Sequence, residues 1–326
     1  MKMLTRIAAV VMAAALLCAP AQSQSDQKTL RLVVGYPAGG GLDAATRLLA
    51  EALRPIAGGN VIVENRPGAA SLIAAQAVAT SAPDGTILLV APISVTAVHP
   101  FIFKDLKFDP NADLVPVAEL GVFGYGLAVN NDIPAKNVEE FIAWAKKNPG
   151  KVSFATLGTG SFAQLLGLIF NDASNAGMVE IPYKGSAPGL LDLRAGVVQA
   201  TFDTNASLME QHRAGAIRIL AMTGKKRSLP EVPTFGELPL NLGPMKESVF
   251  WYGIFAPKGT PKSVVDALSA NINQALKSPA LIERLGKLNI VPEPKNADEF
   301  AAVVARDTKL WSGIINNYKD KIDSSR

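Results

Sequence analysis

Cysteine is almost absent from this chain of 326 residues, since the single one, Cys18, lies in the apolar N-terminal segment. A lone cysteine forms no internal disulfide, and removal of that segment excludes thiol catalysis and cysteine metal sites as well. Histidine is equally scarce: His99 and His212 lie on separate segments without metal-ligand spacing. We expect both histidines at the surface or in loops, and we expect no bound metal.

Other signatures of catalysis and of nucleic-acid binding are also missing. No serine stands in a G-x-S-x-G sequence and no H-E-x-x-H occurs, so neither a nucleophile elbow nor a zincin site is indicated. Charged residues make up 18% of the chain, with a formal net charge of +4, and no basic run is interleaved with aromatic residues. This pattern predicts no nucleic-acid partner. After the N-terminal segment no apolar run is long enough to span a membrane, so we expect no direct membrane insertion.

Residues 1–21 have the pattern of a signal peptide. Two basic residues precede the apolar run Ile7–Leu17, and Ala19–Ala21 supplies small residues before the cleavage point. Lipidation at Cys18 is the less favoured alternative, because a large leucine precedes it. We therefore expect a protein of the periplasm, exported by cleavage after Ala21.

The rest of the chain alternates short apolar strands with amphipathic helices, which is typical of α/β proteins. Its length suggests two domains. Two strand-like stretches, Val115–Val129 and Val249–Ala256, look like crossings between them. We predict a first lobe of residues 26–122 plus 252–326 and a second lobe of residues 123–251, with a ligand cleft between the lobes.

The first glycine-rich turn is a candidate anion site. The apolar strand Leu30–Val34 runs into the turn Tyr36–Gly41, and a helix, Asp43–Arg54, follows at once. Glycine permits close approach of a ligand, and the free amides of a first helical turn favour a carboxylate or phosphate. The Lys-Ser/Thr end of a P-loop is missing, which disfavours a nucleotide. The alternative is a flexible turn with Asp43 as a helix cap, and this turn alone does not decide between the two.

A second glycine turn follows another strand. Gly158–Ala163 matches G-x-G-x-x-A after the strand Val152–Thr156, and Glu180 stands about where a ribose-binding acid is expected. One hypothesis is therefore a secreted NAD(P)-dependent oxidoreductase. We prefer a second anion-binding turn, with Thr159 and Ser161 as extra donors, because an exported protein has little access to a nicotinamide cofactor. The alternative is a tight turn in which Ser161 only caps the helix.

Two further positions are candidates for the cleft. The sequence Tyr183-Lys184-Gly185-Ser186 ends a strand and begins a helix. Lys184 either supplies positive charge to an acid or is simply solvated. Asp203 follows the strand Val197–Phe202, and it either faces the cleft or caps a turn.

Five short motifs, in this order, resemble the substrate-binding proteins of tripartite tricarboxylate transporters, also called Bug receptors. They are Val34–Asp43 (VGYPAGGGLD), Val63–Ala69 (VENRPGA), Ala82–Leu88 (APDGTIL), Ile181–Pro188 (IPYKGSAP) and Leu220–Glu237 (LAMTGKKRSLPEVPTFGE). The likeness extends from about Leu30 to Trp311. It implies a type II periplasmic binding-protein fold: two α/β lobes joined by a two-crossing hinge.

The resemblance also implies a function. It implies a monomeric receptor, neither an enzyme nor a cofactor-binding protein, that captures a small carboxylated metabolite and delivers it to membrane transporter subunits. A receptor that signals to a sensor protein remains the alternative within this class.

In the family, two glycine turns grip the ligand's proximal carboxylate, and they correspond here to Tyr36–Gly40 and Gly158–Gln164. The family often has histidine where Gln164 stands, and Phe162 precedes it here. The ligand and its distal group are not predicted. The expected ligand-binding residues are Tyr36, Pro37, Ala38, Gly39, Gly40, Asp43, Ser94, Thr156, Thr159, Gly160, Ser161, Phe162, Gln164, Tyr183, Lys184 and Asp203.

Overall fold

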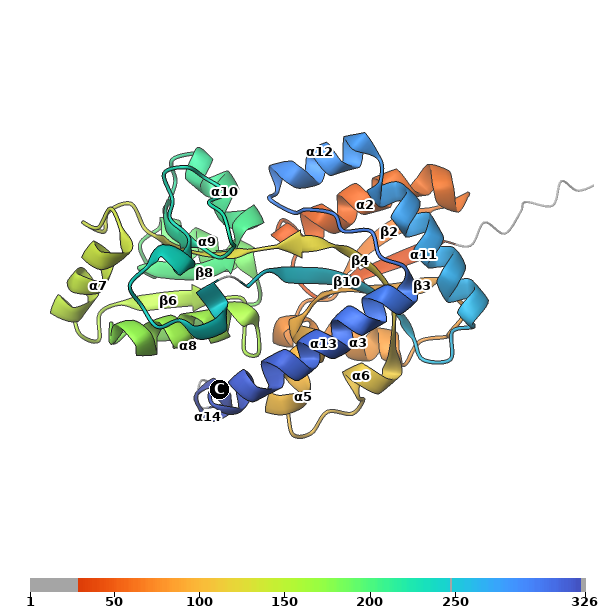
Figure 1. Cartoon of the computed structure of the whole chain (residues 1–326), viewed down its shortest axis with the longest axis horizontal. Helices are drawn as coiled ribbons and strands as arrows, with labels where there is room; N and C mark the ends of the chain where they lie inside the picture. Colours follow the sequence, from red (N-terminus) through yellow and green to blue (C-terminus); the bar gives the residue numbers. More distant parts are fainter. Residues whose placement is uncertain (1–28, 247, 324–326) are drawn as a thin grey trace, which may run out of the picture.

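The computed structural model describes residues 29–246 and 248–323, so the predicted signal peptide lies outside the described residues. Two five-stranded sheets, each flanked by helices, form two lobes that lie side by side (Figure 1). The strand order is β2-β1-β3-β10-β4 in the first sheet and β7-β6-β8-β5-β9 in the second. Both sheets mix parallel and antiparallel strands, and the fold is therefore a two-lobed α/β fold.

The first lobe contains both ends of the described chain. Strands β1 to β3 run parallel, and β10 runs antiparallel to β3 and β4. Its strands are β1 (Leu30–Val34), β2 (Val61–Asn65), β3 (Ile87–Pro92), β4 (Leu114–Phe123) and β10 (Phe250–Pro257). Its helices are α2 (Gly41–Ala57), η2 (Ala69–Ser71), α3 (Leu72–Ala79), α4 (Ser94–Ala97), α5 (His99–Ile102), α6 (Pro110–Asp113), α11 (Lys262–Leu276), α12 (Pro279–Lys287), α13 (Ala297–Asn316) and α14 (Lys319–Asp323).

The second lobe is inserted between β4 and β10. Strand β6 pairs in parallel with β7 and β8, and β5 runs antiparallel to β8 and β9. Its strands are β5 (Tyr125–Val129), β6 (Ser153–Thr156), β7 (Val179–Pro182), β8 (Ala200–Thr204) and β9 (Arg218–Met222). Its helices are α7 (Val138–Lys147), α8 (Phe162–Ser174), α9 (Ser186–Arg194), α10 (Asn205–Arg213), η3 (Phe235–Glu237) and η4 (Gly243–Lys246).

The chain crosses between the lobes at two adjacent points. The stretch Val115–Val129 forms two strands, β4 and β5, separated by Gly124, and β10 returns beside β4 with Phe250 opposite Phe123. Phe123 stacks on Tyr252 with ring centroids 3.9 Å apart. Aromatic packing of this kind contributes beyond simple area burial, so the crossing strands are firmly held.

A third connection comes from the C-terminal helices. Helix α13 extends along the first lobe toward the second, and α14 lies beside α8 (Figure 1). The Trp311 ring meets Phe162 of α8 edge-on, with centroids 4.7 Å apart. Lys321 of α14 forms an ion pair with Asp172 of α8. The two lobes are thus braced on the side of α8 as well as at the crossing strands.

Within residues 29–246 and 248–323, no helix is both long and apolar enough to cross a membrane.

Candidate ligand-binding site

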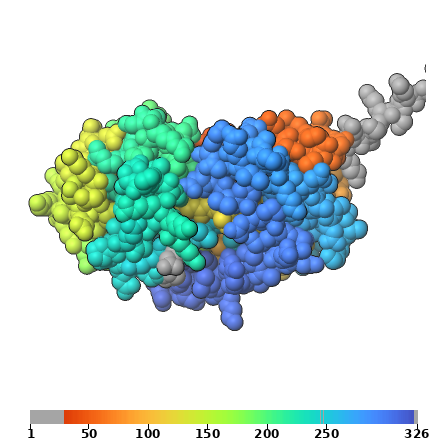
Figure 2. Space-filling view, turned by 45° about the horizontal axis from the view of Figure 1, so that its top comes forward, coloured from red at the N-terminus to blue at the C-terminus, as the bar shows by residue number. Residues whose placement is uncertain are grey.

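A small cavity lies between the lobes, where the crossing strands meet the helix starts. Its volume is about 20 Å³, which is room for about one water molecule. The lobes are therefore closed on each other, and in the space-filling view the second lobe abuts the C-terminal helices of the first (Figure 2). The cavity is lined by Tyr36, Gly40, Gly41, Leu42, Pro92, Tyr125, Leu157, Ser186, Thr204 and Tyr252.

The first glycine turn forms the first-lobe side of this cavity. The Asp43 side chain holds the turn in place. Its carboxylate accepts hydrogen bonds from the Gly39 amide at 3.0 Å and from the Asn65 side chain at 2.8 Å. Arg47 donates to the same carboxylate at 3.0 Å. Burial would raise the Asp43 pKa, but these hydrogen bonds and the Arg47 charge outweigh burial and lower it. Asp43 is not the helix cap, since Gly40 holds the N-cap position without a side-chain hydrogen bond; instead its carboxylate holds the turn that precedes α2, and its side chain is engaged within its own lobe.

Three helices begin at the cavity. Helix α2 starts at Gly41 in the first lobe, while α9 starts at Ser186 and α10 starts at Asn205 in the second. The amides of a first helical turn have no acceptor within the helix, and each helix start carries partial positive charge. Three such ends meeting at one point can hold an anion, even though no lysine, arginine or histidine lines the cavity.

A chain of hydrogen bonds joins the lobes at this point. The Gly41 amide donates to Ser207 Oγ at 3.2 Å, and Ser207 Oγ donates to Ser186 Oγ at 3.2 Å. Ser186 Oγ in turn donates to Asp203 Oδ1 at 2.7 Å. A methyl group on Gly41 would lie only 2.9 Å from Thr204 Oγ1, so this position has no room for a side chain.

Asp203 lies directly behind the cavity. Its Oδ1 also accepts from the adjacent Thr204 amide at 2.6 Å, and its bond to Ser186 turns it toward the start of α9; the cap of α10 is Thr204. Burial raises the Asp203 pKa to about 7, although the hydrogen bonds from Ser186 and Thr204 oppose the shift. Burial and the Asp203 charge both raise the pKa of Tyr36 and of Tyr252, two residues of the cavity wall.

The second glycine turn is organised differently. The Gly160 amide donates to Gln164 Oε1 at 2.7 Å, and the Gln164 amide donates to Ser161 Oγ at 3.2 Å. Gln164 Nε2 then donates to Glu180 at 3.0 Å, and Thr156 Oγ1 donates to the same carboxylate at 2.7 Å. Ser161 is thus the cap of its own helix, and the Gly160 and Ser161 amides already have acceptors in the second lobe.

The outer face of this second turn packs against the first lobe. A methyl group on Gly160 would lie 2.7 Å from Ile102 and 3.2 Å from His99. Phe162, expected as a ligand contact, is fully buried between Phe250 and Trp311, with centroid distances of 4.8 Å and 4.7 Å. Among the residues of the second glycine turn and its flanks, 156–164, only Leu157 lines the cavity.

The prediction of surface or loop positions for the histidines is wrong for His99. It lies on α5 with 0% exposure, and neither ring nitrogen makes a hydrogen bond of normal geometry with a described residue. Burial lowers its pKa to about 3, so the ring is neutral. His99 is buried by apolar neighbours on α5 and by the Gly160 turn. The sequence around His99 gave no sign of this burial. His212 is a partly buried residue of helix α10.

Other predicted residues lie around the cavity without lining it. Pro37 contacts the second lobe, because a methyl group on Gly185 would lie 2.8 Å from its ring. Tyr183 donates to Asp192 at 2.6 Å, and burial, with that hydrogen bond, raises its pKa to about 12. Lys184 is exposed, which supports the solvated interpretation. Three more predicted ligand-binding residues lie outside the cavity lining. Ala38 and Gly39 are exposed, and Thr159 is half-buried.

Two further serines of the first lobe, Ser94 and Ser71, are buried. Ser94, a predicted site residue at the start of α4, and Ser71, which was not predicted, make no hydrogen bond of normal geometry with a described residue. Ser71 lies against Gly35 and beside Tyr36, at the edge of the cavity. Its hydroxyl lies against the Tyr36 hydroxyl, whose pKa it lowers slightly against the larger effect of burial.

The sequence predictions missed eight of the lining residues. Signals existed for Ser186, which stands in a motif already noted, and for Tyr125 and Tyr252, which lie in the two predicted crossing strands. Thr204 follows the predicted Asp203. No sequence signal marked Pro92 or Leu157, because their place depends on how the lobes close. The missed residues are Gly41, Leu42, Pro92, Tyr125, Leu157, Ser186, Thr204 and Tyr252.

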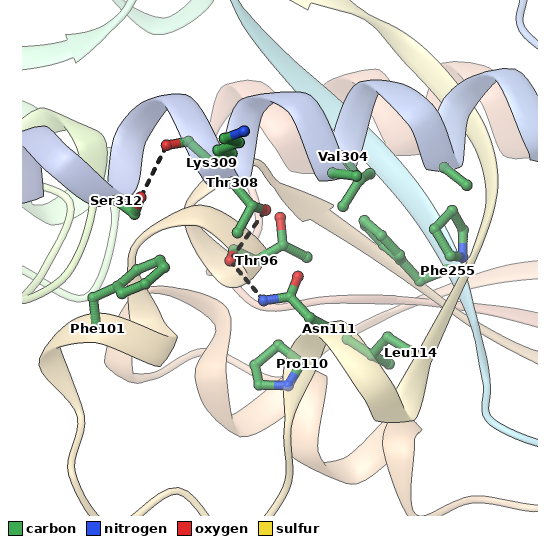
Figure 3. A pocket seen from close by; sticks show the side chains of 13 residues that line it. Thr96, Phe101, Pro110, Asn111, Leu114, Phe255, Val304, Thr308, Lys309 and Ser312 are labelled. Atoms are coloured by element: carbon green, nitrogen blue, oxygen red, sulfur yellow. Dashed lines mark hydrogen bonds between the residues drawn. The ribbon is translucent and has the colours of Figure 1, made fainter.

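A larger hollow exists on the first lobe, away from the three helix starts. It has a volume of about 440 Å³ and lies between α13 and the segment of α4 to α6 (Figure 3). Phe101, Leu114, Phe255 and Val304 give it largely apolar walls, and Thr308 and Lys309 lie along its α13 side. The second lobe contributes no residue to this hollow, so we assign the ligand site to the smaller cavity. In the part of the chain that the structure describes, no cluster of side chains could hold a metal ion.

Comparison with known proteins gives one consistent result. Residues 45–319 match the family described as "Tripartite tricarboxylate transporter family receptor". Protein BugT of Bordetella pertussis is 33% identical over 326 residues, covering 98% of this chain and 99% of BugT.

Solved structures with the same fold include periplasmic binding proteins. The periplasmic binding protein BugD superposes with a TM-score of 0.84 at 31% identity, covering 89% of this chain and 97% of BugD. MatC from Rhodopseudomonas palustris, with bound malate, superposes with a TM-score of 0.82 at 28% identity, covering 88% of this chain and 98% of MatC.

Proposed function

This chain belongs to the family of tripartite tricarboxylate transporter receptors, and on that premise we propose that it captures a small carboxylate between its lobes in the periplasm. It then presents the closed complex to membrane subunits of a transporter. The proposal includes export by the predicted signal peptide and action as a monomer. It makes the protein a binding receptor, with no chemical turnover of the ligand.

One observation carries this proposal: three helix starts from both lobes meet at one cavity that no basic side chain lines. A carboxylate at this point accepts hydrogen bonds from amides of α2 and from the Ser186 hydroxyl, which turns its single proton from Asp203 to the ligand. Hydrogen bonds to a charged acceptor are about twice as strong as neutral ones. Because the donors come from both lobes, the bound anion favours the closed state.

In the closed structure, side chains of the second lobe occupy the place of the ligand. Ser207 Oγ accepts the Gly41 amide, and the remaining space holds about one water molecule. A ligand therefore enters after the lobes separate, and its carboxylate replaces Ser207 at the start of α2. The crossing strands at Gly124 and Phe250 provide the hinge for this movement.

The family match does not support the oxidoreductase alternative. Glu180, the expected ribose-binding acid, is held by Thr156 and Gln164. The Gly160 amide, which would face a pyrophosphate, is held by Gln164.

Calorimetry of the mature protein against a panel of small carboxylic acids, with NADH as a comparison ligand, tests the proposal. We expect at least one acid to bind with micromolar or better affinity and NADH not to bind. Binding of NADH and of none of the acids would contradict the proposal.

A further inference from the structure

We propose that helix α10 is an autoinhibitory element, which docks on the first lobe in the place of the ligand and holds the receptor in a closed conformation that admits none. The inference rests on the proposed function, because it assumes that a carboxylate binds at the start of α2. It adds a competition within the protein itself, since a ligand gains access only when α10 leaves the first lobe.

The first observation is the contact between the starts of α10 and α2. Ser207, in the first turn of α10, is buried and accepts the Gly41 amide at 3.2 Å. Thr204, the cap of α10, holds this serine in place, because its hydroxyl donates to Ser207 Oγ at 3.1 Å. The Gly41 amide belongs to the first turn of α2, where no acceptor exists within the helix. Ser207 Oγ therefore takes the position that the proposed function gives to an oxygen of the ligand.

The second observation is the narrow space between the two helix starts. The cavity of about 20 Å³ has room for about one water molecule. A methyl group on Gly41 would already lie 2.9 Å from Thr204 Oγ1 and 3.0 Å from the methyl group of Ala206. Even the smallest carboxylate is larger than a water molecule, so no ligand fits while α10 keeps this place. A ligand-bound conformation is therefore more open at α10 than the one described here.

The third observation is a second pair of contacts at the far end of α10, where α10 meets α12 (Figure 1). Arg213, the last residue of α10, donates to the Lys287 carbonyl at 3.3 Å. This carbonyl ends α12, and a cation there also meets the negative end of the helix dipole. Asn289, just beyond α12, donates to Met209 Sδ at 3.1 Å. Helix α10 thus contacts the first lobe both at the ligand cavity and at the outer surface.

Helix α10 is fixed to the second lobe, and its partners are fixed to the first. Leu208 is fully buried in a hydrophobic cluster of the second lobe. On the other side, Val291, two residues after Asn289, pairs with Val122 of β4 through backbone hydrogen bonds of 2.8 Å and 2.9 Å. The contacts at the two ends of α10 therefore form and break together as the lobes close and open.

These contacts are of a strength that a carboxylate can overcome. The inner contact joins two neutral groups, whereas a hydrogen bond from the Gly41 amide to a carboxylate is about twice as strong. The self-closed conformation still lowers the apparent affinity, because only the fraction of molecules in the open conformation can bind. Loosening α10 should therefore strengthen ligand binding rather than weaken it.

Two variants of the mature protein test the inference, with the acid that binds most tightly in the calorimetric panel. Ser207→Ala removes the oxygen that occupies the Gly41 amide, and Arg213→Ala removes an outer contact without touching the cavity. We expect each variant to bind the acid about three- to tenfold more tightly than the wild type. Stopped-flow measurements should show the gain as faster association, with little change in dissociation, because the variants enlarge the open fraction.

The control is Arg194→Ala, which removes an exposed arginine at the end of α9 in the same lobe and should leave affinity unchanged. Unchanged or weaker binding by either folded variant would overturn the inference and leave the carboxylate receptor intact. Tighter binding that arose wholly from slower dissociation would also overturn it. Failure of every acid in the panel to bind the wild type would contradict the proposed function itself.

Discussion

The turns Tyr36–Gly41 and Gly158–Ser161 both join a buried strand to a helix, but their amides meet different acceptors. In the second turn, Gln164 and Ser161 of the same lobe accept from the turn and from the first helical amides. In the first turn, the Gly41 amide reaches across the cleft to Ser207. The lesson is that a glycine-rich helix start becomes a ligand site only where its own lobe leaves the amides free.

The two turns also differ in what lies outside them. The first faces a cavity and the starts of two helices from the other lobe. The second is packed against His99 and Ile102, with no space for even a methyl group. We therefore propose that the first turn serves ligand binding and that the second serves packing between the lobes.

The largest expected effect comes from adding a side chain to each turn in separate variants. Gly41→Val would collide with Thr204 and Ala206 on closure, so we expect affinity for the best acid to fall about 100-fold, within the range of overpacking costs. The melting temperature should change little, because the collision occurs only between closed lobes. Calorimetry and thermal unfolding measure the two quantities.

Gly160→Ala is the matched variant in the second turn. Its φ of +83° and its contact with Ile102 predict a loss of about 1–3 kcal/mol in stability, with affinity changed less than about fivefold. Gly313→Ala, which places a methyl group in open space on α13, is the control for both variants. The distinction between the turns would break down if Gly160→Ala weakened binding as much as Gly41→Val.

The next largest effect is a dependence of the folding stability on pH, caused by the buried His99. Its native pKa of about 3 lies below the ordinary 6.5, so the native state binds fewer protons than the unfolded state between these values. Stability is therefore full above about pH 6.5 and should fall by about 2 kcal/mol at pH 5. Urea unfolding at pH 7 and pH 5 measures this difference.

His99→Gln is the control for that measurement, because it removes the titrating ring and should flatten the profile. A wild-type stability that stayed constant from pH 7 to pH 5 would show that His99 is not held neutral against the Gly160 turn.

A smaller effect distinguishes the serines of the two helix starts. Ser186→Ala removes the hydroxyl that donates to Asp203 and faces the cavity, so we expect about a tenfold loss of affinity. Ser161→Ala removes a helix cap, which should cost about 1 kcal/mol of stability and leave affinity within about twofold. A larger loss of affinity from Ser161→Ala would reverse the assignment of the two turns.

The smallest effect is the pH dependence of affinity from Asp203. Its pKa of about 7 means that it gains a proton between pH 8 and pH 6. Protonation removes a negative charge beside the bound carboxylate, so affinity for the best acid of the panel should rise about threefold over this range. Asp203→Asn should bind with the same affinity at both pH values. An affinity that fell toward pH 6 would contradict this role for Asp203.

The fold was largely predictable from the sequence, because strands such as Leu30–Val34 and the apolar spacing of α2 are local signals. Helix α2 is longer than predicted, since Gly41 starts it and it continues through Pro55 to a left-handed cap at Gly58. Strand β9 and helices α7 and α10 were not predicted. The amphipathic pattern of α7 was available in the sequence and was overlooked, whereas α10 has a weaker apolar face.

The site was predicted only in part. The first turn and Asp203 were found because strand–glycine–helix patterns mark them directly. The second turn has the same pattern, but the use of its amides by Gln164 is a side-chain contact that spacing does not reveal. The apolar wall of Pro92 and Leu157 forms only when two distant segments close on each other. The sequence near each residue does not indicate how the two lobes close.

A crystal structure with the acid that binds most tightly in the calorimetric panel tests the central claim most directly. We predict carboxylate oxygens within hydrogen-bond distance of the amides at the start of α2 and of Ser186 Oγ, with Ser207 displaced from Gly41. A carboxylate held by the amides of Gly158–Phe162, with Gln164 displaced, would contradict the account.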